Sequence, residues 1–283
     1  MKPLLAVVLT ALAVPTAAAT PLTPPDFSGF WKRSYQISET FDPPPAGLQG
    51  PVVQDPRYPA TNHDGVPRRP LSEAERAKVV QFTQNWVGDV NSPILTPKTR
   101  AALQAIDDQE LAGVPHPENQ TRCMMSGTPS VLNLFEGMKM LQTPDEVTIL
   151  YERDHHVRHV YLNRAHSPDP GHSWWGESVG HYEGKTLVVD TFSENDQTQV
   201  DRFGTSHSDQ IHVVERYTIS DDRKTIDVLI MVEDPIAFTM PWWATAHYVP
   251  DKENFSEIVC AENLRGYWPG HPVSFPVADK PEF

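Results

Sequence analysis

The chain has 283 residues, with 37 acidic and 23 basic side chains, and carries a net charge of −14 when its 12 histidines are counted as neutral. Such a surface repels phosphate and anionic lipid. No run of basic residues is longer than Arg68-Arg69, so we expect no nucleic-acid partner. The 28 prolines argue against a helical bundle, and a hydrophobic content of 39% is enough for a core. We therefore expect a β-rich domain whose partners are neutral, cationic or apolar.

The N-terminus has the pattern of a secretory signal peptide. Met1-Lys2 precedes an apolar run over residues 4–14, and small residues at 17–19 form a cleavage site. This run is too short for a permanent transmembrane helix, and no later segment approaches the roughly 20 apolar residues of a span. We expect a signal peptide over residues 1–19 and a periplasmic or secreted mature chain with no membrane span.

The sequence contains two cysteines, Cys123 and Cys260. In an oxidising compartment, two thiols far apart in sequence more often pair than stay free. We expect a disulfide between them.

The first part of the mature chain is rich in proline. Residues 20–70 are expected to form an extension that contains a first strand at 27–31 and wraps a core made by residues 71–283. Ser72 begins a capping box that predicts a helix up to Gly88. Thr96 followed by Pro97 predicts a second helix that stops at Gly113. We expect one compact domain over residues 20–283.

The pattern then changes to the alternation typical of strands. Strands are predicted at 131–141, 147–152, 156–162, 177–183, 186–192, 212–220, 225–233 and 243–249. Short turns between them predict antiparallel neighbours, and so many strands need closure or stacking to protect their edges. The predicted fold is mainly β, either an antiparallel barrel or a two-layer sandwich, with two short N-terminal helices.

Titratable residues are dense between residues 190 and 217. His212 and Arg216 share one face of the strand at 212–220. If both point into a pocket that Asp190 and His247 also reach, a base, an orienting carboxylate and a cation converge there. The alternative is a surface ladder of cross-strand pairs. The catalytic candidates are His212, Arg216, Asp190, His207 and His247.

Aromatic residues supply the candidates for substrate binding. Tryptophans occur in pairs beside proline-containing loops, and an indole ring stacks well on sugars and aromatic rings. Because alternation turns one member of each pair outward, such a pair can line a binding site. The candidates are Trp174, Trp175, Trp243, Tyr217 and Arg158.

Two further patterns have plain structural explanations. The segment 176–180 matches the G-x-S-x-G nucleophile elbow, but the residues after it predict a hairpin, so we expect glycines that allow close packing. His155 and His159 have a spacing known from zinc sites, yet on a strand they lie about 13 Å apart. We expect no metal and no cofactor, and keep a histidine-ligated metal as an alternative.

Gly29 and Trp31 open the first strand in the manner of lipocalins, in which this pair closes the bottom of a barrel. Together with residues 26–31, the segments 176–191 and 212–217 resemble a large group of exported bacterial proteins. The resemblance covers most of the mature chain and implies a shared fold without an activity. The helices expected at 73–112 depart from the lipocalin pattern.

Three functions follow from these features. The first is an exported, cofactor-independent enzyme that uses histidine, arginine and carboxylate groups as a lyase, isomerase or hydrolase. Its substrate is a neutral or aromatic small molecule or a glycoside. The alternatives are a lipocalin-like carrier of an apolar ligand and a metalloprotein.

Overall fold

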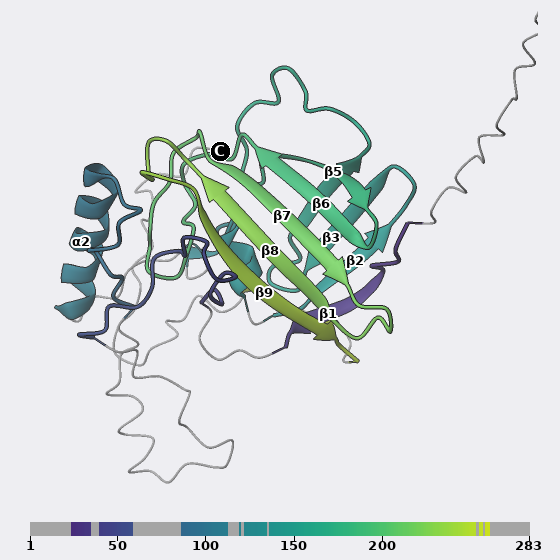
Figure 1. Cartoon of the computed structure of the whole chain (residues 1–283), viewed down its shortest axis with the longest axis horizontal. Helices are drawn as coiled ribbons and strands as arrows, with labels where there is room; N and C mark the ends of the chain where they lie inside the picture. The colour runs from purple at the N-terminus through teal and green to yellow at the C-terminus, as the bar shows by residue number, and fades with distance from the viewer. Residues whose placement is uncertain are drawn as a thin grey trace, which may run out of the picture.

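The computed structural model describes residues 24–34, 40–58, 86–112, 119, 122–134, 136–252, 255–256 and 258–260. Within this part, the strands form one closed barrel in which β1 pairs with both β2 and β9 (Figure 1). The strands are β1 Gly29–Arg33, β2 Met138–Gln142, β3 Glu146–Tyr151, β4 Val157–Leu162, β5 Glu177–Glu183, β6 Thr186–Phe192, β7 His212–Ile219, β8 Ile226–Glu233 and β9 Trp242–Pro250. The expected mainly β, lipocalin-like barrel is confirmed. The expected signal peptide and most of the expected first helix lie outside the described residues.

Alternation along the strands decides what fills the barrel. On β8, the residues at every second position from Ile226 to Val232 are completely or almost completely buried, while Asp227 between them is exposed. The neighbouring strand β9 places Ala244 and Ala246 against this row in the same register. The predicted apolar face of the strand at 225–233 therefore lines the interior.

One strand pair departs from the expected antiparallel order. β4 and β5 are parallel, because the segment 163–176 returns the chain along the barrel before β5 begins. Gly176 ends this crossing with a φ of +57°, and a Cβ atom there would lie 2.0 Å from the carbonyl oxygen of Phe192. At Gly180, a Cβ atom would lie 2.9 Å from Cγ1 of Val160. The glycines of the G-x-S-x-G segment are thus packing glycines, as expected.

The strand predicted at 131–141 is only partly correct. Residues Ser130–Asn133 form a short 3-10 helix, η3, and β2 begins later, at Met138. Val131 and Leu132 are both buried in this helix. Burial of consecutive apolar residues, rather than alternation, explains why this segment reads like a strand.

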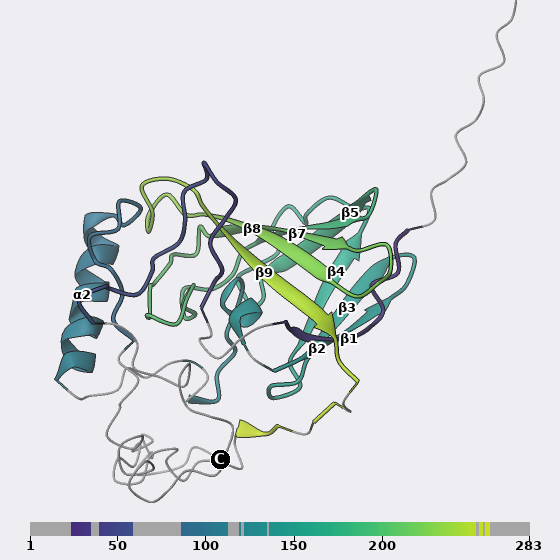
Figure 2. The same ribbon diagram turned by 60° about the horizontal axis from the view of Figure 1, so that its bottom comes forward.

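A single long helix accompanies the barrel in the described part of the chain. α2 spans Pro97–Leu111 and flanks one side of the barrel (Figures 1 and 2). The Oγ1 atom of Thr96 accepts a hydrogen bond from the backbone N–H of Thr99, which caps the helix as predicted. Leu103 packs into the hydrophobic core. The second predicted helix is confirmed.

The lipocalin-like opening sits where the resemblance implies. Trp31 is buried, and its indole N–H donates to the carbonyl oxygen of Phe27 at 2.9 Å. Phe27 in turn stacks on Tyr182 of β5, with ring centres 6.4 Å apart. These rings fill one end of the barrel.

The expected disulfide between Cys123 and Cys260 is present and links positions 137 residues apart. It ties the end of the described chain to the segment before η3. None of the described helices is long and apolar enough to cross a membrane.

Candidate active site in the barrel interior

An ion pair lies inside the barrel between β4 and β7. The Nη1 and Nη2 atoms of Arg158 lie 3.0 and 2.5 Å from the two carboxylate oxygens of Glu215, and both side chains are fully buried. Removing two charges from water is costly unless further hydrogen bonds compensate. Arg158 also donates to Ser178 at 3.1 Å and to Thr191 at 2.8 Å. The pair is therefore held in one fixed geometry.

Tyrosine hydroxyls surround this pair. Tyr217 donates to Glu215 at 2.8 Å, and Tyr248 donates to the carbonyl oxygen of Leu132 in η3 at 2.9 Å. The hydroxyl of Tyr151 lies beside Arg158, whose charge and hydrogen bond favour its ionised form. Burial raises the pKa of Tyr151 to about 12, so this hydroxyl keeps its proton at neutral pH.

A fully buried carboxyl group, Glu194, feels the charge of Arg158. Glu194 follows β6, and both of its carboxyl oxygens accept from the backbone N–H of Thr128, at 2.8 and 3.0 Å. Complete burial raises the pKa of Glu194 to about 8, against the opposing effects of the Thr128 hydrogen bonds and the Arg158 charge. Near neutral pH this group is mostly an uncharged acid.

The loop between β6 and β7 also contains a histidine paired with a threonine. Thr198 Oγ1 lies 2.6 Å from His207 Nε2, and His207 Nδ1 lies 2.8 Å from the carbonyl oxygen of Ser208. Because a carbonyl can only accept, we assign the proton to Nδ1, which leaves Nε2 to accept from Thr198. Burial lowers the pKa of His207, so the ring is neutral.

Gly127 brings the two halves of this cluster together. A Cβ atom at this position would lie 2.7 Å from Thr198 Oγ1 and 2.8 Å from Glu194 Oε2. The hydroxyl of Thr198 and the carboxyl of Glu194 therefore converge on the same small space. A side chain larger than hydrogen at Gly127 would clash with both groups.

Trp175 covers the cluster on one side. Its ring stacks on Tyr151, with centres 5.4 Å apart and planes 10° from parallel, and His156 contacts it edge-on. Tyr151 is buried, whereas Trp175 retains part of its exposure. The aromatic wall of the cluster thus reaches toward solvent at Trp175.

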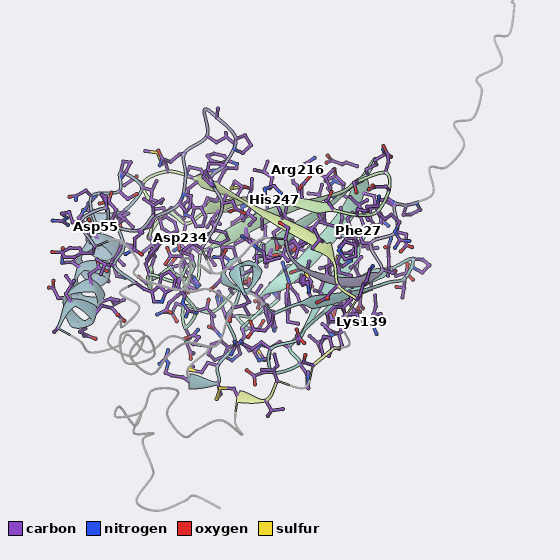
Figure 3. The ribbon with its side chains drawn as sticks, turned by 90° about the horizontal axis from the view of Figure 1, so that it is seen from below. Phe27, Asp55, Lys139, Arg216, Asp234 and His247 are labelled. Carbon is purple, nitrogen blue, oxygen red and sulfur yellow. A yellow bond between two sulfur atoms is a disulfide. The ribbon has the colours of Figure 1, made fainter. Side chains whose placement is uncertain are left out.

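The structure spreads the predicted catalytic residues over different places. His212 and Asp190 are hydrogen-bonded at 2.9 Å on the outer face of the barrel. Arg216 and His247 also lie on the outer face, paired with Glu183 and Asp227 (Figure 3). His207 belongs to the buried cluster instead. These five side chains do not share one pocket, because alternation on β7 turns His212 and Arg216 outward.

The predicted binding residues divide in a similar way. Arg158, Tyr217 and Trp175 all belong to the interior cluster. Trp174 is half-buried beside Trp175. On β9 it is Trp242 that faces the core, while the predicted Trp243 is turned the other way and is half-buried.

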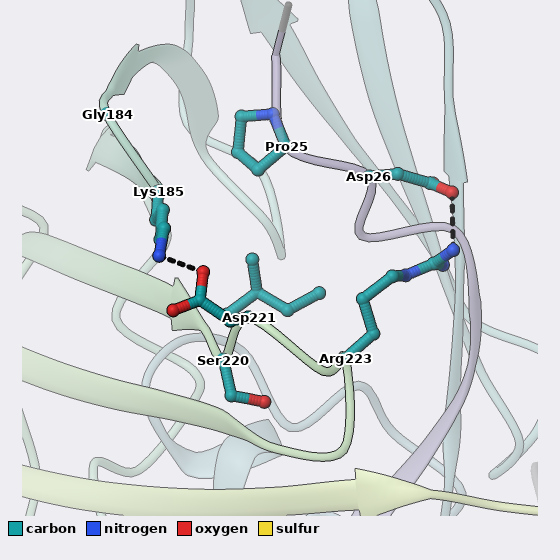
Figure 4. Close-up of a pocket in the computed structure, with 8 residues that line it drawn as sticks. Pro25, Asp26, Gly184, Lys185, Ser220, Asp221 and Arg223 are labelled. Carbon is teal, nitrogen blue, oxygen red and sulfur yellow. Dashed lines mark hydrogen bonds and ion pairs between the residues drawn. The ribbon is translucent and has the colours of Figure 1, made fainter.

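A pocket also lies near the other end of the barrel, where residues 25–26 meet the turns at 184–185 and 219–223 (Figure 4). Lys185 is paired with Asp221, and Arg223 with Asp26 at 2.8 Å. All four side chains are exposed or nearly so, and such pairs contribute little binding energy. The lining offers no unpaired charge to a ligand.

Sequence reasoning missed Glu194, Tyr151 and Thr198. The signal for Glu215 was present, since it shares the face of β7 with Val213 and Ile219, and a carboxylate on an apolar face needs a partner. The partner, Arg158, lies far away in sequence. Nothing in the sequence around Glu194 shows that it becomes buried.

In the described part of the chain, no three His, Cys, Asp or Glu side chains are arranged to hold a metal ion. No family of known proteins, no curated relative and no solved structure matches the chain.

Proposed function

We propose that the protein is an exported, cofactor-independent enzyme that performs acid–base chemistry at the interior cluster. One arrangement carries the proposal: the buried Glu194 carboxyl and the Thr198 hydroxyl, the partner of His207, converge at Gly127, where the charge of Arg158 also acts on Glu194. Burial raises the pKa of this carboxyl to about 8. Buried titratable groups with shifted pKa values gather at active sites more often than elsewhere. A group that titrates near neutral pH is also the most effective proton donor there.

Each group then has a role. Glu194 is the general acid. His207, held neutral by burial, is the general base, which acts through the hydroxyl of Thr198. Arg158 and Glu215 fix the geometry of the wall against which the substrate lies. The chemistry is that of a lyase, isomerase or hydrolase, and the substrate is a neutral or aromatic molecule, because a second buried charge would be costly.

The compartment is part of the proposal. The disulfide between Cys123 and Cys260 supports a location outside the reducing cytoplasm. Residues 1–19, with their apolar run and small residues, supply the export signal. We propose a periplasmic or secreted protein whose mature chain begins at Thr20.

The test compares turnover in the wild type and in Glu194→Gln. Both are incubated with a defined panel of aromatic ketones, aryl esters and aryl glycosides, and products are detected by mass spectrometry. Gln keeps the shape of Glu and cannot donate the proton, so turnover should fall by about 100-fold or more. Glu233→Gln, on the outer face beside His212, is the matched control and should retain full turnover.

A carrier is the other outcome. The wall of alanine and branched aliphatic side chains on β8 and β9 favours an apolar ligand. If panel compounds bind but are recovered unchanged from both proteins, the enzyme proposal is wrong and the carrier function is supported. Equal turnover in the wild type and Glu194→Gln would show that Glu194 is not the general acid.

A further inference from the structure

The connection between β4 and β5, residues 163–176, lies over the interior cluster near its end. Ser173 forms a parallel bridge with Glu194, in which its N–H and carbonyl oxygen make backbone hydrogen bonds of 3.1 and 2.8 Å to the residues on either side of Glu194. Two residues later, the ring of Trp175 stacks on Tyr151. The end of the connection therefore covers the Glu194 side of the cluster.

The middle of the connection is open to solvent. Residues 167–173 are all exposed, and a Cβ atom at Gly171 would have nothing within 4 Å. His172 lies 4.0 Å from Asp209, but both side chains are exposed and such a pair adds little. An exposed stretch of this kind opens locally at a low free-energy cost. Its position therefore depends on the contacts at its two ends.

The start of the connection is fixed by the carboxylate of Glu177, the first residue of β5. Glu177 accepts from the guanidinium of Arg164 at 2.9 Å and from the backbone N–H and the hydroxyl of Ser167, each at 2.7 Å. The Nδ1 atom of His166 lies 3.1 Å from it. Burial alone would raise the pKa of Glu177, but the hydrogen bonds from Ser167 and His166 outweigh it and lower the pKa. Glu177 is therefore ionised.

Two imidazole rings extend this contact across the outer face of the barrel. The Nε2 atoms of His166 and His212 lie 3.4 and 2.9 Å from the same oxygen, Oδ1 of Asp190. Phe192 contacts both rings, with centres 4.9 Å apart for His166 and 4.0 Å apart for His212. The Nδ1 atom of His212 lies 2.8 Å from Glu233. Each of the four ring nitrogens thus faces a carboxylate oxygen.

This arrangement suits protonated rings. A neutral imidazole has one N–H and one lone pair, so it donates to one carboxylate and directs its lone pair at the other. A protonated imidazole donates to both. With both rings protonated, the positive and negative side chains of the group balance, whereas neutral rings leave two negative charges uncompensated. The group consists of Arg164 and His166 from the connection, Glu177 from β5, Asp190 from β6, His212 from β7 and Glu233 from β8.

We propose that the connection 163–176 is a pH-sensitive lid over the interior cluster, latched by the protonated imidazoles of His166 and His212 through the carboxylate of Asp190, which they share. The lid is closed at acid pH and is released as the rings lose their protons. Both rings are half-buried, so protons reach them from solvent. The lid controls access to the site of the proposed function, and in that role it rests on that function.

The direction of the pH effect follows from linkage. Burial alone would lower the pKa of His212, but its two carboxylates outweigh burial and raise it. A raised pKa in the folded protein means that the stabilisation is fully present below the ordinary value of about 6.5 and is lost as the pH rises through the folded value. The latch is therefore weaker at pH 8 than at pH 5.5.

Amide hydrogen exchange, followed residue by residue by NMR in the mature protein, tests the lid. The reporters are the N–H groups of Ser173 and Asn195, which make the backbone hydrogen bonds between the lid and the barrel. The amides of β8 are the reference, and protection factors correct for the pH dependence of exchange from free amides. From pH 5.5 to pH 8, the protection of both reporters should fall by about tenfold relative to β8, the effect of one charge-assisted hydrogen bond.

Two variants change the latch in different ways. His166→Gln cannot become charged, so the protection of the reporters should be low at both pH values. Asp190→Asn has an amide that accepts from a charged ring and donates to a neutral one, so the fall between pH 5.5 and pH 8 should be smaller than in the wild type.

His181→Gln is the matched control. His181 lies on the same strand as Glu177, with Nε2 at 3.0 Å from Glu183, and both side chains of this pair are exposed. The protection of the reporters should be that of the wild type. Constant protection in the wild type, a fall that persists unchanged in His166→Gln, or an equal loss in His181→Gln would overturn the inference.

The exchange experiment needs no substrate, so it separates the lid from the proposed function. A lid that opens with pH, together with equal turnover in the wild type and Glu194→Gln, supports the latch and contradicts the proposed general acid. Turnover that depends on Glu194, together with reporters equally protected at both pH values, supports the enzyme and overturns the latch.

Discussion

The imidazole of His212 lies 2.9 Å, through Nε2, from the Oδ1 atom of Asp190 on the outer face of the barrel. Its other nitrogen lies 2.8 Å from Glu233, and its ring stacks on Phe192 with centres 4.0 Å apart. Burial alone would lower the pKa of His212, but the two carboxylates outweigh it and raise the pKa. For Asp190, burial is outweighed by the hydrogen bond and charge of His212, and the pKa is lowered. The pair stabilises its own charged state.

This pair predicts a pH-dependent part of the stability. Because the pKa of His212 is raised on folding, its contribution is fully present below the unfolded value of about 6.5 and is lost as the pH rises through the folded value. His212→Gln should therefore lower the free energy of unfolding by about 1 kcal/mol near pH 6 and by less near pH 9. Urea unfolding of both proteins over this range measures the difference.

His247→Gln serves as the control for His212. His247 is also paired with an aspartate, at 2.6 Å from Asp227, but both side chains are exposed. Its replacement should change the stability little at either pH. A His212→Gln difference that is constant with pH would show that the ring acts through packing against Phe192 and not through charge.

The two arginines on opposite faces of the barrel predict opposite outcomes. Arg158→Met leaves the carboxylate of Glu215 buried without its cation, which costs about 3–5 kcal/mol of unfolding free energy. Arg216→Met removes an exposed partner of Glu183 and should change stability little. The double variant Arg158→Met/Glu215→Leu should recover much of the loss, since no unpaired charge remains. Equal losses for Arg158→Met and Arg216→Met in urea unfolding would contradict this interpretation.

Much of the barrel could be predicted from the sequence because its strands alternate cleanly. The predicted strand at 186–192 matches the structure, and those at 212–220 and 225–233 differ by a single residue. The turn signals and the alternation are local, so they need no knowledge of the partner strand. The strand prediction for residues 131–137 was wrong because consecutive buried residues in η3 give a hydrophobic pattern with no helical or strand period.

The site was less predictable because its residues are far apart in sequence and come together only in the folded barrel. Sequence parity separated His212 from Glu215 correctly, but it could not show that Arg158 is the partner of Glu215. That pairing depends on closure of the barrel, in which β1 and β9, the first and last strands of the chain, lie side by side. The burial of Glu194 depends on the segment around Thr128, which lies far from it in sequence.

The disulfide predicts a large stability effect. Cys123 and Cys260 close a loop with a sequence separation of 137, for which chain entropy suggests a stabilisation on the order of 4 kcal/mol. The paired variant Cys123→Ala/Cys260→Ala should unfold at lower urea yet keep its fold, because a backbone hydrogen bond from the N–H of Asp154 to the carbonyl oxygen of Ile258 also holds this segment. Reduction should destabilise the wild type to the same extent and leave the paired variant unchanged. Equal stability of the oxidised wild type and the variant would show that the bond adds no stability.

Glu194 should make the wild type less stable as the pH rises. Its folded pKa of about 8 lies above the unfolded value of about 4.3, so the protonated form stabilises the fold below the lower value and this advantage is lost as the pH rises toward 8. Asp107 and Asp201, with pKa values raised by burial to about 7 and about 6, add the same trend. The wild-type curve alone therefore cannot isolate Glu194. Glu194→Gln cannot ionise, so the difference between the two proteins in urea unfolding should move in favour of the variant between about pH 5 and pH 8. A difference that does not vary with pH would mean that Glu194 has the same pKa in the folded and the unfolded protein. Glu194 would then be ionised at neutral pH and could not be the proposed general acid.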